Sequence, residues 1–128
     1  MTIELSMLAY TVALLFLLVL IQALAGVLAQ GLPAMAGSRD QLGEPSRMQA
    51  RTKRLVDNHR EGLLLFAPLV LIASLTGTST EWTVLGAQLF FYSRVVHAIL
   101  YLTGVPWVRP VAWVAGIAGC ILIFVALF

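Results

Sequence analysis

Four polar side chains recur at helical spacing just before the chain becomes strongly apolar. This first stripe consists of Arg51, Arg54, Asn58 and Glu61. At about 100° per residue, the four fall within an arc of roughly 80° on one side of a helix. Guanidinium groups hold carboxylates through paired hydrogen bonds, and a carboxylate can receive an ammonium group. The first stripe therefore predicts a site for a small anion or a zwitterionic peptide.

A second stripe lies on the other side of the same expected helix and consists of Lys53, Asp57 and Arg60. Its acid is four residues from the lysine and three from the arginine, spacings at which opposite charges pair on a solvated helix surface. We interpret the second stripe as surface ion pairs. His59 flanks it, and both histidines are isolated from other ligand types, so we predict no metal site.

The third apolar run of the chain, Trp82 to Leu102, also carries polar residues at helical spacing. Arg94, His97 and Tyr101 are spaced i, i+3 and i+7, and they share an arc of about 60°. Because consecutive spans run antiparallel, the deepest residue of each pattern lies level with the other. We therefore predict a Glu61–Arg94 ion pair, which would neutralise two charges that are costly inside a bilayer.

One turn before Glu61, we expect Asn58 to face His97, so that the two polar patterns border a pocket between their helices. The mouth of this pocket is expected to be cationic and to carry hydrogen-bond donors, which come from Arg51, Arg54, Tyr101 and Arg109. Two simpler interpretations stay open. The first stripe could consist of long side chains that reach the membrane interface and pack against other helices. His97 could be a buried histidine with its hydrogen bonds made inside the protein.

The composition is that of an integral membrane protein. Hydrophobic residues make up 60% of the 128, charged residues only 11%, and the mean hydropathy is +0.94. At roughly 20 residues per crossing, the chain can hold about four spans and little else. Ten of its fourteen charges lie in the segment 39–61. This mixed segment is accompanied by no groove-reading motif, so nucleic acid is not an expected partner.

We expect one all-α membrane domain over residues 1–128, a four-helix up-and-down bundle with helices at about 5–30, 47–75, 82–103 and 109–128. Glycine and proline over 31–45 predict the longest loop. Small residues spaced by four, Ala112, Gly116 and Cys120, give the last helix a face for close packing. Lysine and arginine distribution places the first and third loops in the cytoplasm and both termini on the opposite side, with the inner (plasma) membrane expected if the source is bacterial.

These residues also carry a family resemblance. The pattern R-x-x-R-x-x-x-N-x-x-E over 51–61, the run R-V-V-H-A-I-L-Y-L over 94–102, and then Arg109 resemble the MAPEG family. That family comprises membrane-associated proteins of eicosanoid and glutathione metabolism. Its members include microsomal glutathione transferases and microsomal prostaglandin E synthase. The chain resembles the prostaglandin synthase most in the two polar motifs, and it resembles small bacterial members in its length and short loops.

The resemblance implies a homotrimer that binds glutathione near the cytoplasmic face and acts as a transferase or peroxidase on lipophilic electrophiles or hydroperoxides. It assigns the glutathione contacts to Arg51, Arg54, Asn58, Glu61, His97, Tyr101 and Arg109. Membrane lipid is a further expected partner. Because the thiolate is the reactive form of a thiol, we expect Arg109 to activate it, with Tyr101 as the rival donor.

The chain departs from the family pattern after Arg109. Pro110 and Trp113 stand where the prostaglandin synthases offer a serine and a tyrosine, which excludes a hydroxyl role there. The alternative is therefore a non-catalytic lipid-binding or scaffold protein of the same family. A small proton carrier using Glu61 and His97 is less favoured, because no polar positions continue across the membrane.

Overall fold

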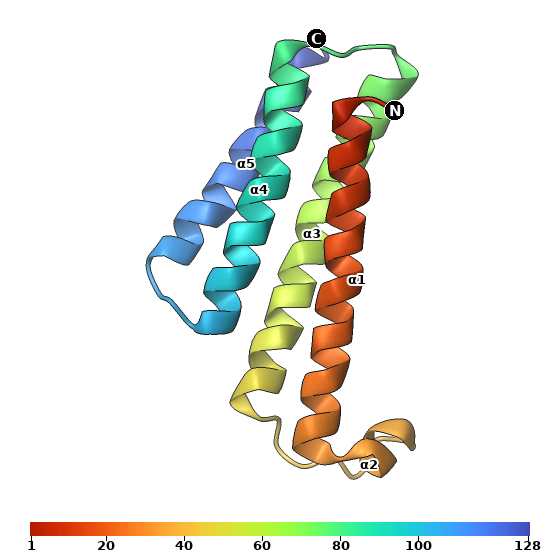
Figure 1. Ribbon diagram of the computed structural model, residues 1–128, viewed down its shortest axis with the longest axis vertical. Helices are drawn as coiled ribbons and strands as arrows, with labels where there is room; N and C mark the ends of the chain where they lie inside the picture. Colours follow the sequence, from red (N-terminus) through yellow and green to blue (C-terminus); the bar gives the residue numbers. More distant parts are fainter.

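The computed structural model describes all 128 residues and is entirely helical (Figure 1). Its elements are α1 (Ile3–Gln30), α2 (Leu32–Ala36), α3 (Arg47–Leu75), α4 (Glu81–Thr103) and α5 (Val108–Ala126). The four long helices run alternately down and up, so both termini lie at one end. Their bounds differ from the ranges expected from the sequence by at most two residues.

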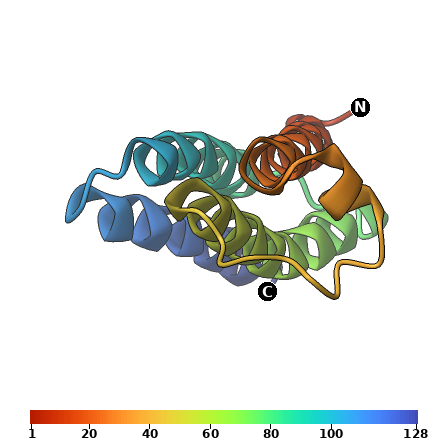
Figure 2. The same cartoon turned by 90° about the horizontal axis from the view of Figure 1, so that it is seen from below.

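The four long helices form a square in cross-section (Figure 2). Helices α3 and α4 each contact the other three long helices, whereas α1 and α5 do not touch and occupy opposite corners. The lower ends of α1 and α3 extend beyond the turn that joins α4 to α5. The α3–α4 pair is therefore the centre of the bundle, and it positions the polar side chains of both motifs.

Local sequence sets where the central helices begin and end. Ser46 caps α3 through a reciprocal pair of hydrogen bonds with Gln49, and Thr80 caps α4 in the same way with Thr83. Gly104 ends α4 at φ 76°, a left-handed conformation that glycine adopts without steric cost. These caps set the start of α3 and both ends of α4.

The segment expected to be a loop over 31–45 contains one short helix, α2. Pro33 lies in its first turn, where the missing backbone N–H has no helical partner to lose. Gln30 then holds the rest of the segment against α1. Its Nε2 donates to the carbonyl of Glu44 at 3.2 Å, and its Oε1 accepts from the backbone N–H of Gly43 at 3.2 Å.

Helices α4 and α5 approach each other at backbone distance. A Cβ placed on Gly86 would lie 2.6 Å from the carbonyl oxygen of Gly119, and one on Gly116 would lie 2.9 Å from Ser93 Oγ. The expected small-residue face, Ala112, Gly116 and Cys120, is buried. Close packing of this kind is the usual basis of helix association in lipid.

The outer surface is apolar. Leu64 is 74% exposed, and Phe16 and Val111 are similarly open. Helices α1, α4 and α5 are long and apolar enough to cross a membrane; α3 does not meet that test because its first half carries both polar stripes. The chain is therefore an integral membrane protein whose large apolar side chains face lipid.

Candidate functional site

Tyr101 lies at the centre of the polar end of the bundle. Arg54, from the second turn of α3, donates from its Nε to the Tyr101 hydroxyl at 3.2 Å. The guanidinium carbon of Arg109, from the first turn of α5, lies 4.7 Å from the Tyr101 ring centroid, a cation–π distance. The His97 ring is one turn earlier on α4, at 5.5 Å between centroids. Three helices thus converge on one phenol.

A cavity of about 290 Å³ opens beside this phenol. Its walls are Asn58, His97, Tyr101, Arg109, Pro110 and Trp113. The structure therefore brings Asn58 and His97 together, as the register of the two helices requires. Sequence reasoning noted Pro110 and Trp113 only as departures from a family pattern. Trp113 is four residues after Arg109 and three after Pro110, a spacing that could have placed it on the same side of α5 as each of them.

Arg94 lies behind this cavity and is only 2% exposed. Its Nη2 donates to Asn58 Oδ1 at 2.7 Å. The predicted Glu61–Arg94 ion pair is wrong, because Glu61 is exposed and forms no ion pair in the chain. Asn58 and Gly62 occupy the line of α3 that faces α4, and Glu61 is about 100° around the helix from Gly62.

Arg51 occupies the edge of the site. A Cβ on Gly104 would lie only 2.7 Å from an Arg51 guanidinium nitrogen, so Arg51 packs across the turn that ends α4. Glycine at this position provides both the positive φ and the room for that side chain. Arg51 and Arg54 thus border Tyr101 from the start of α3, whereas Glu61 stands apart from the cavity.

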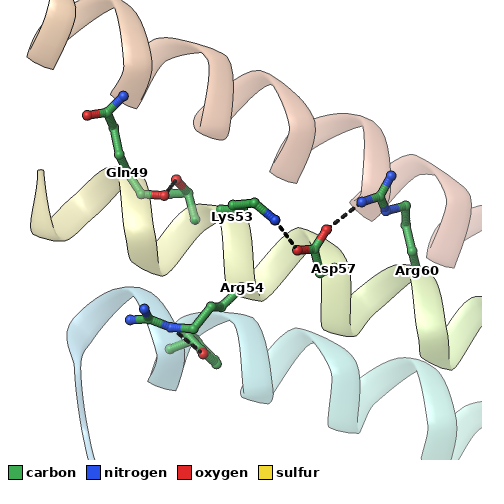
Figure 3. A network of polar contacts seen from close by, with 7 residues as sticks. Gln49, Lys53, Arg54, Asp57 and Arg60 are labelled. Carbon is green, nitrogen blue, oxygen red and sulfur yellow. Dashed lines mark hydrogen bonds and ion pairs between the residues drawn. The ribbon is translucent and has the colours of Figure 1, made fainter. Parts of the chain in front are cut away.

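The charges of the second stripe pair with one another. Lys53 Nζ lies 2.7 Å from Asp57 Oδ2, and Arg60 pairs with Asp57 Oδ1, as the sequence spacing predicted. Figure 3 shows these side chains on the α1 side of α3, with Arg54 turned toward α4. Hydrogen bonds from Lys53 and Arg60 hold the pKa of Asp57 below its usual value. Both basic side chains remain largely exposed.

The charges around the cavity are not paired in this way. The only ion pairs in the chain are those of the second stripe, so Arg54, Arg94 and Arg109 have no carboxylate partner. Helix α5 also begins here without a side-chain cap, and a helix N-terminus carries a partial positive charge. The cavity is therefore a cationic environment at the edge of an apolar bundle.

His59 does not lie at the surface beside the second stripe, as the sequence suggested. It is 1% exposed, and its Nε2 lies 3.0 Å from the carbonyl oxygen of Thr11 on α1. On α3, this position faces between α1 and α4 rather than toward solvent. Helical periodicity alone could not distinguish the two, because a residue beside an exposed stripe can also border a neighbouring helix.

Comparison with known proteins identifies the family. The family model described as MAPEG matches residues 7–128, which is nearly the whole chain. No curated protein and no solved structure matches it. The match includes the helices that carry the cationic cavity, and membership supports a membrane function related to glutathione or eicosanoids. The chain belongs to the MAPEG family.

Proposed function

We propose that the chain is a glutathione-dependent membrane transferase or peroxidase, which activates the glutathione thiolate against lipophilic electrophiles or hydroperoxides. The observation that carries this proposal is the unbalanced positive charge around the cavity. Arg94 is buried without a carboxylate, and Arg109 lines the cavity. A buried charge without an ionic partner is costly, and an anionic ligand nearby lowers that cost.

Glutathione offers two carboxylates, one ammonium group and one thiol. Bidentate hydrogen bonding suits Arg51 and Arg54 to the carboxylates, because Arg54 contacts Tyr101 of the cavity wall and Arg51 packs across the turn that ends α4. Asn58 and His97 line the cavity and supply shorter polar contacts. Glu61 supplies the acceptor for the ammonium group. Its exposure on the side of α3 requires that part of the peptide lie outside the cavity.

Activation requires that the bound thiol lose its proton. The thiolate is the nucleophile, and nearby positive charge favours it. Arg109 supplies that charge, reinforced by the uncapped start of α5. Tyr101 supplies a second contact, because Arg54 donates to its oxygen and leaves its O–H free to donate to sulfur. In conjugation, the thiol proton leaves to water and sulfur forms a bond to the electrophilic carbon, while the bond from that carbon to its leaving group, or its π bond to a neighbouring atom, breaks and takes the electron pair away.

The site is completed by other copies of the chain in a homotrimer. The cavity of about 290 Å³ lies at the low end of small-molecule sites, which run from about 300 to 1,000 Å³. An exposed carboxylate at Glu61, one residue before α3 becomes apolar, is also costly against lipid. A neighbouring subunit would cover Glu61 and give the cavity its missing wall.

All four long helices cross the membrane in this proposal, and α3 projects its charged first half at one side. The lysines and arginines then place that side in the cytoplasm, with both termini opposite, in the plasma membrane of a bacterial source. Trp82 near one end and Trp107 near the other are 60% and 87% exposed, as interfacial anchors would be.

A second candidate function is non-catalytic binding of lipid. An apolar groove of about 470 Å³ lies between α1 and α3, bordered by Leu15, Leu64, Pro68 and Leu71 among others. A groove of this kind fits an acyl chain, and Pro110 and Trp113 bring no hydroxyl to the cavity. If the chain only binds lipid, the cationic cavity has no catalytic role.

The replacement Arg109→Ala separates the two functions. We expect turnover of a lipophilic electrophile to fall by about 100-fold or more, because electrostatic stabilisation of a reacting anion contributes on that order. Glutathione binding should be largely retained. Lys53→Ala is the matched control and should turn over like the wild type. Equal turnover in Arg109→Ala would discard Arg109 as the activator, and no turnover by the wild type with any electrophile or hydroperoxide would favour lipid binding.

A further inference from the structure

His59 is a buried group that the proposed chemistry does not use. Its Nε2 contacts the carbonyl oxygen of Thr11, and a carbonyl can only accept. Nε2 therefore carries the hydrogen. A second proton would create another buried cation without a carboxylate, so the ring is neutral and its Nδ1 presents a lone pair.

Three buried polar atoms in this part of the bundle have no hydrogen-bond partner within the chain. They are His59 Nδ1, His97 Nδ1 and Arg94 Nε. The Arg94 guanidinium contacts α3 both before and after His59 in the sequence. It bonds to Asn58, the preceding residue, and its carbon lies 3.7 Å from the position of a Cβ on Gly62, three residues later.

His97 lies one turn from Arg94 on α4, and Thr11 brings α1 to the same level. The three unpartnered atoms therefore belong to residues grouped around the Arg94 guanidinium, next to Asn58 and His97, which line the cavity. Gly62 lets α3 and α4 approach closely here, since a Cβ on it would lie 3.3 Å from the Phe90 ring.

The hydrogen-bonding types of these atoms are complementary through one water molecule. Arg94 Nε–H can only donate, His59 Nδ1 can only accept, and His97 Nδ1 accepts when its proton is on Nε2. A buried water typically makes about three hydrogen bonds to groups that are otherwise unsatisfied. One water that accepts from Arg94 and donates to both imidazoles satisfies all three atoms.

We propose that this group of residues is a binding site for one buried water, and that through it His59 is a positioning residue for Arg94 and His97. The water holds the His97 proton on Nε2, the nitrogen left to face the cavity. His97 then presents a hydrogen-bond donor to an anionic ligand. This last step rests on the proposed glutathione function, whereas the water site itself does not.

The first test uses wild-type protein without glutathione. The chain has two histidines, so protein labelled with ¹⁵N in its imidazoles gives two rings, which His59→Gln assigns. We expect both rings as neutral Nε2–H tautomers, with each Nδ1 resonance shifted to lower frequency by hydrogen bonding and with cross-peaks to water protons. An Nδ1–H tautomer at either ring, or a His59 Nδ1 at the frequency of a free lone pair, would overturn the water site.

The second test separates the two nitrogens of His59. Glutamine places an amide near Nε2 and keeps the bond to Thr11, whereas asparagine places one near Nδ1 and keeps the acceptor. With folding verified by circular dichroism, we expect glutathione to bind His59→Gln about fivefold more weakly, the usual effect of one hydrogen bond. His59→Asn should melt at a lower temperature and keep the affinity.

These outcomes distinguish the water site from the proposed function. Unchanged affinity in folded His59→Gln would overturn the positioning role. Lys53→Gln, on the exposed side of α3, is the matched control and should change neither the spectra nor the affinity. Failure of the wild type to bind glutathione would refute the proposed function and, with it, the role of His97 as ligand donor, while the spectra alone would still decide the water site.

Discussion

The two stripes of α3 use the same kinds of side chain but differ in whether their charges pair. On the second stripe, Asp57 lies between Lys53 and Arg60 and pairs with both in an exposed chain of contacts. On the first stripe, the arginines meet a phenol and a turn. Its acid, Glu61, points away from Arg94, which bonds to Asn58 instead. Charge on the first stripe is thus left available for a ligand.

The difference lies in what each stripe faces. Exposed ion pairs contribute at most about 1 kcal/mol, and water screens them, so the second stripe can change at little cost. On the first stripe, Asn58 instead reaches the buried Arg94 on α4, and burial makes that polar contact more expensive to lose. Four replacements on α3 test this contrast.

Asn58→Leu should have the largest effect. It removes the hydrogen-bond partner of the buried Arg94 guanidinium, and a buried charged group left unsatisfied costs about 3 kcal/mol. The free energy of unfolding in detergent, from thermal or denaturant melts, measures this loss. A change below about 1 kcal/mol would show that Arg94 finds another partner, and the contrast between the stripes would weaken.

Gly62→Ala should destabilise the chain by about 1–3 kcal/mol, the range for overpacking a close contact. The new Cβ would lie 3.3 Å from the Phe90 ring and 3.7 Å from the Arg94 guanidinium carbon. Gly77→Ala is a poor control because of its positive φ, so an exposed site such as Ser38→Ala serves better. Equal melting temperatures for Gly62→Ala and wild type would mean that Phe90 moves aside freely.

Glu61→Gln should weaken glutathione binding about tenfold, because the peptide ammonium loses a charged acceptor. The stability of an isolated chain should hardly change, since Glu61 is exposed and has no partner there. Calorimetric affinity and a melt on the same preparation measure the two effects. Loss of stability together with trimer dissociation, and with affinity intact, would mean that Glu61 serves only the subunit interface and does not bind the ammonium group.

Asp57→Asn should have the smallest effect on the free energy of unfolding, because it breaks only exposed pairs that water screens. Its pKa is depressed in the folded chain, so the stability it contributes is present above the ordinary carboxyl pKa and fades as the pH falls through the lower folded value. The difference between wild type and Asp57→Asn should accordingly vanish in acid. A large difference at neutral pH would contradict the contrast between the stripes.

The sequence predicted the helices and the membrane character well. Hydropathy and the position of glycine and proline set the bounds, and the small residues of α5 predicted its close packing. It missed α2, because Pro33 was taken as a breaker although proline fits the first turn of a helix. It also missed the contact of Gly86 with Gly119, since spacing along one helix does not identify the facing residue on another.

Four of the residues named from the sequence, Asn58, His97, Tyr101 and Arg109, line one cavity, but the polar contacts expected among the two motifs differ from those observed. Asn58 and Arg94 lie at the same height along α3 and α4. An arc of roughly 80° is too wide to say which edge of the first stripe turns toward the neighbouring helix. Asn58 therefore reaches Arg94, and Glu61 does not. His59 was misplaced for the same reason. Such errors arise because helical periodicity fixes the direction of a side chain only to within about one side-chain width. A hydrogen bond requires its two atoms to be placed much more accurately than that.

The most direct test compares one residue from each stripe. Detergent-purified wild type, Arg54→Ala and Lys53→Ala, each verified as folded, are titrated with reduced glutathione in a calorimeter. We expect saturable binding by wild type and Lys53→Ala, and an affinity about 10 to 100 times lower for Arg54→Ala, the effect of losing a hydrogen bond to a charged group. Equal affinities for the two variants, or no binding by folded wild type, would contradict a glutathione site on the first stripe.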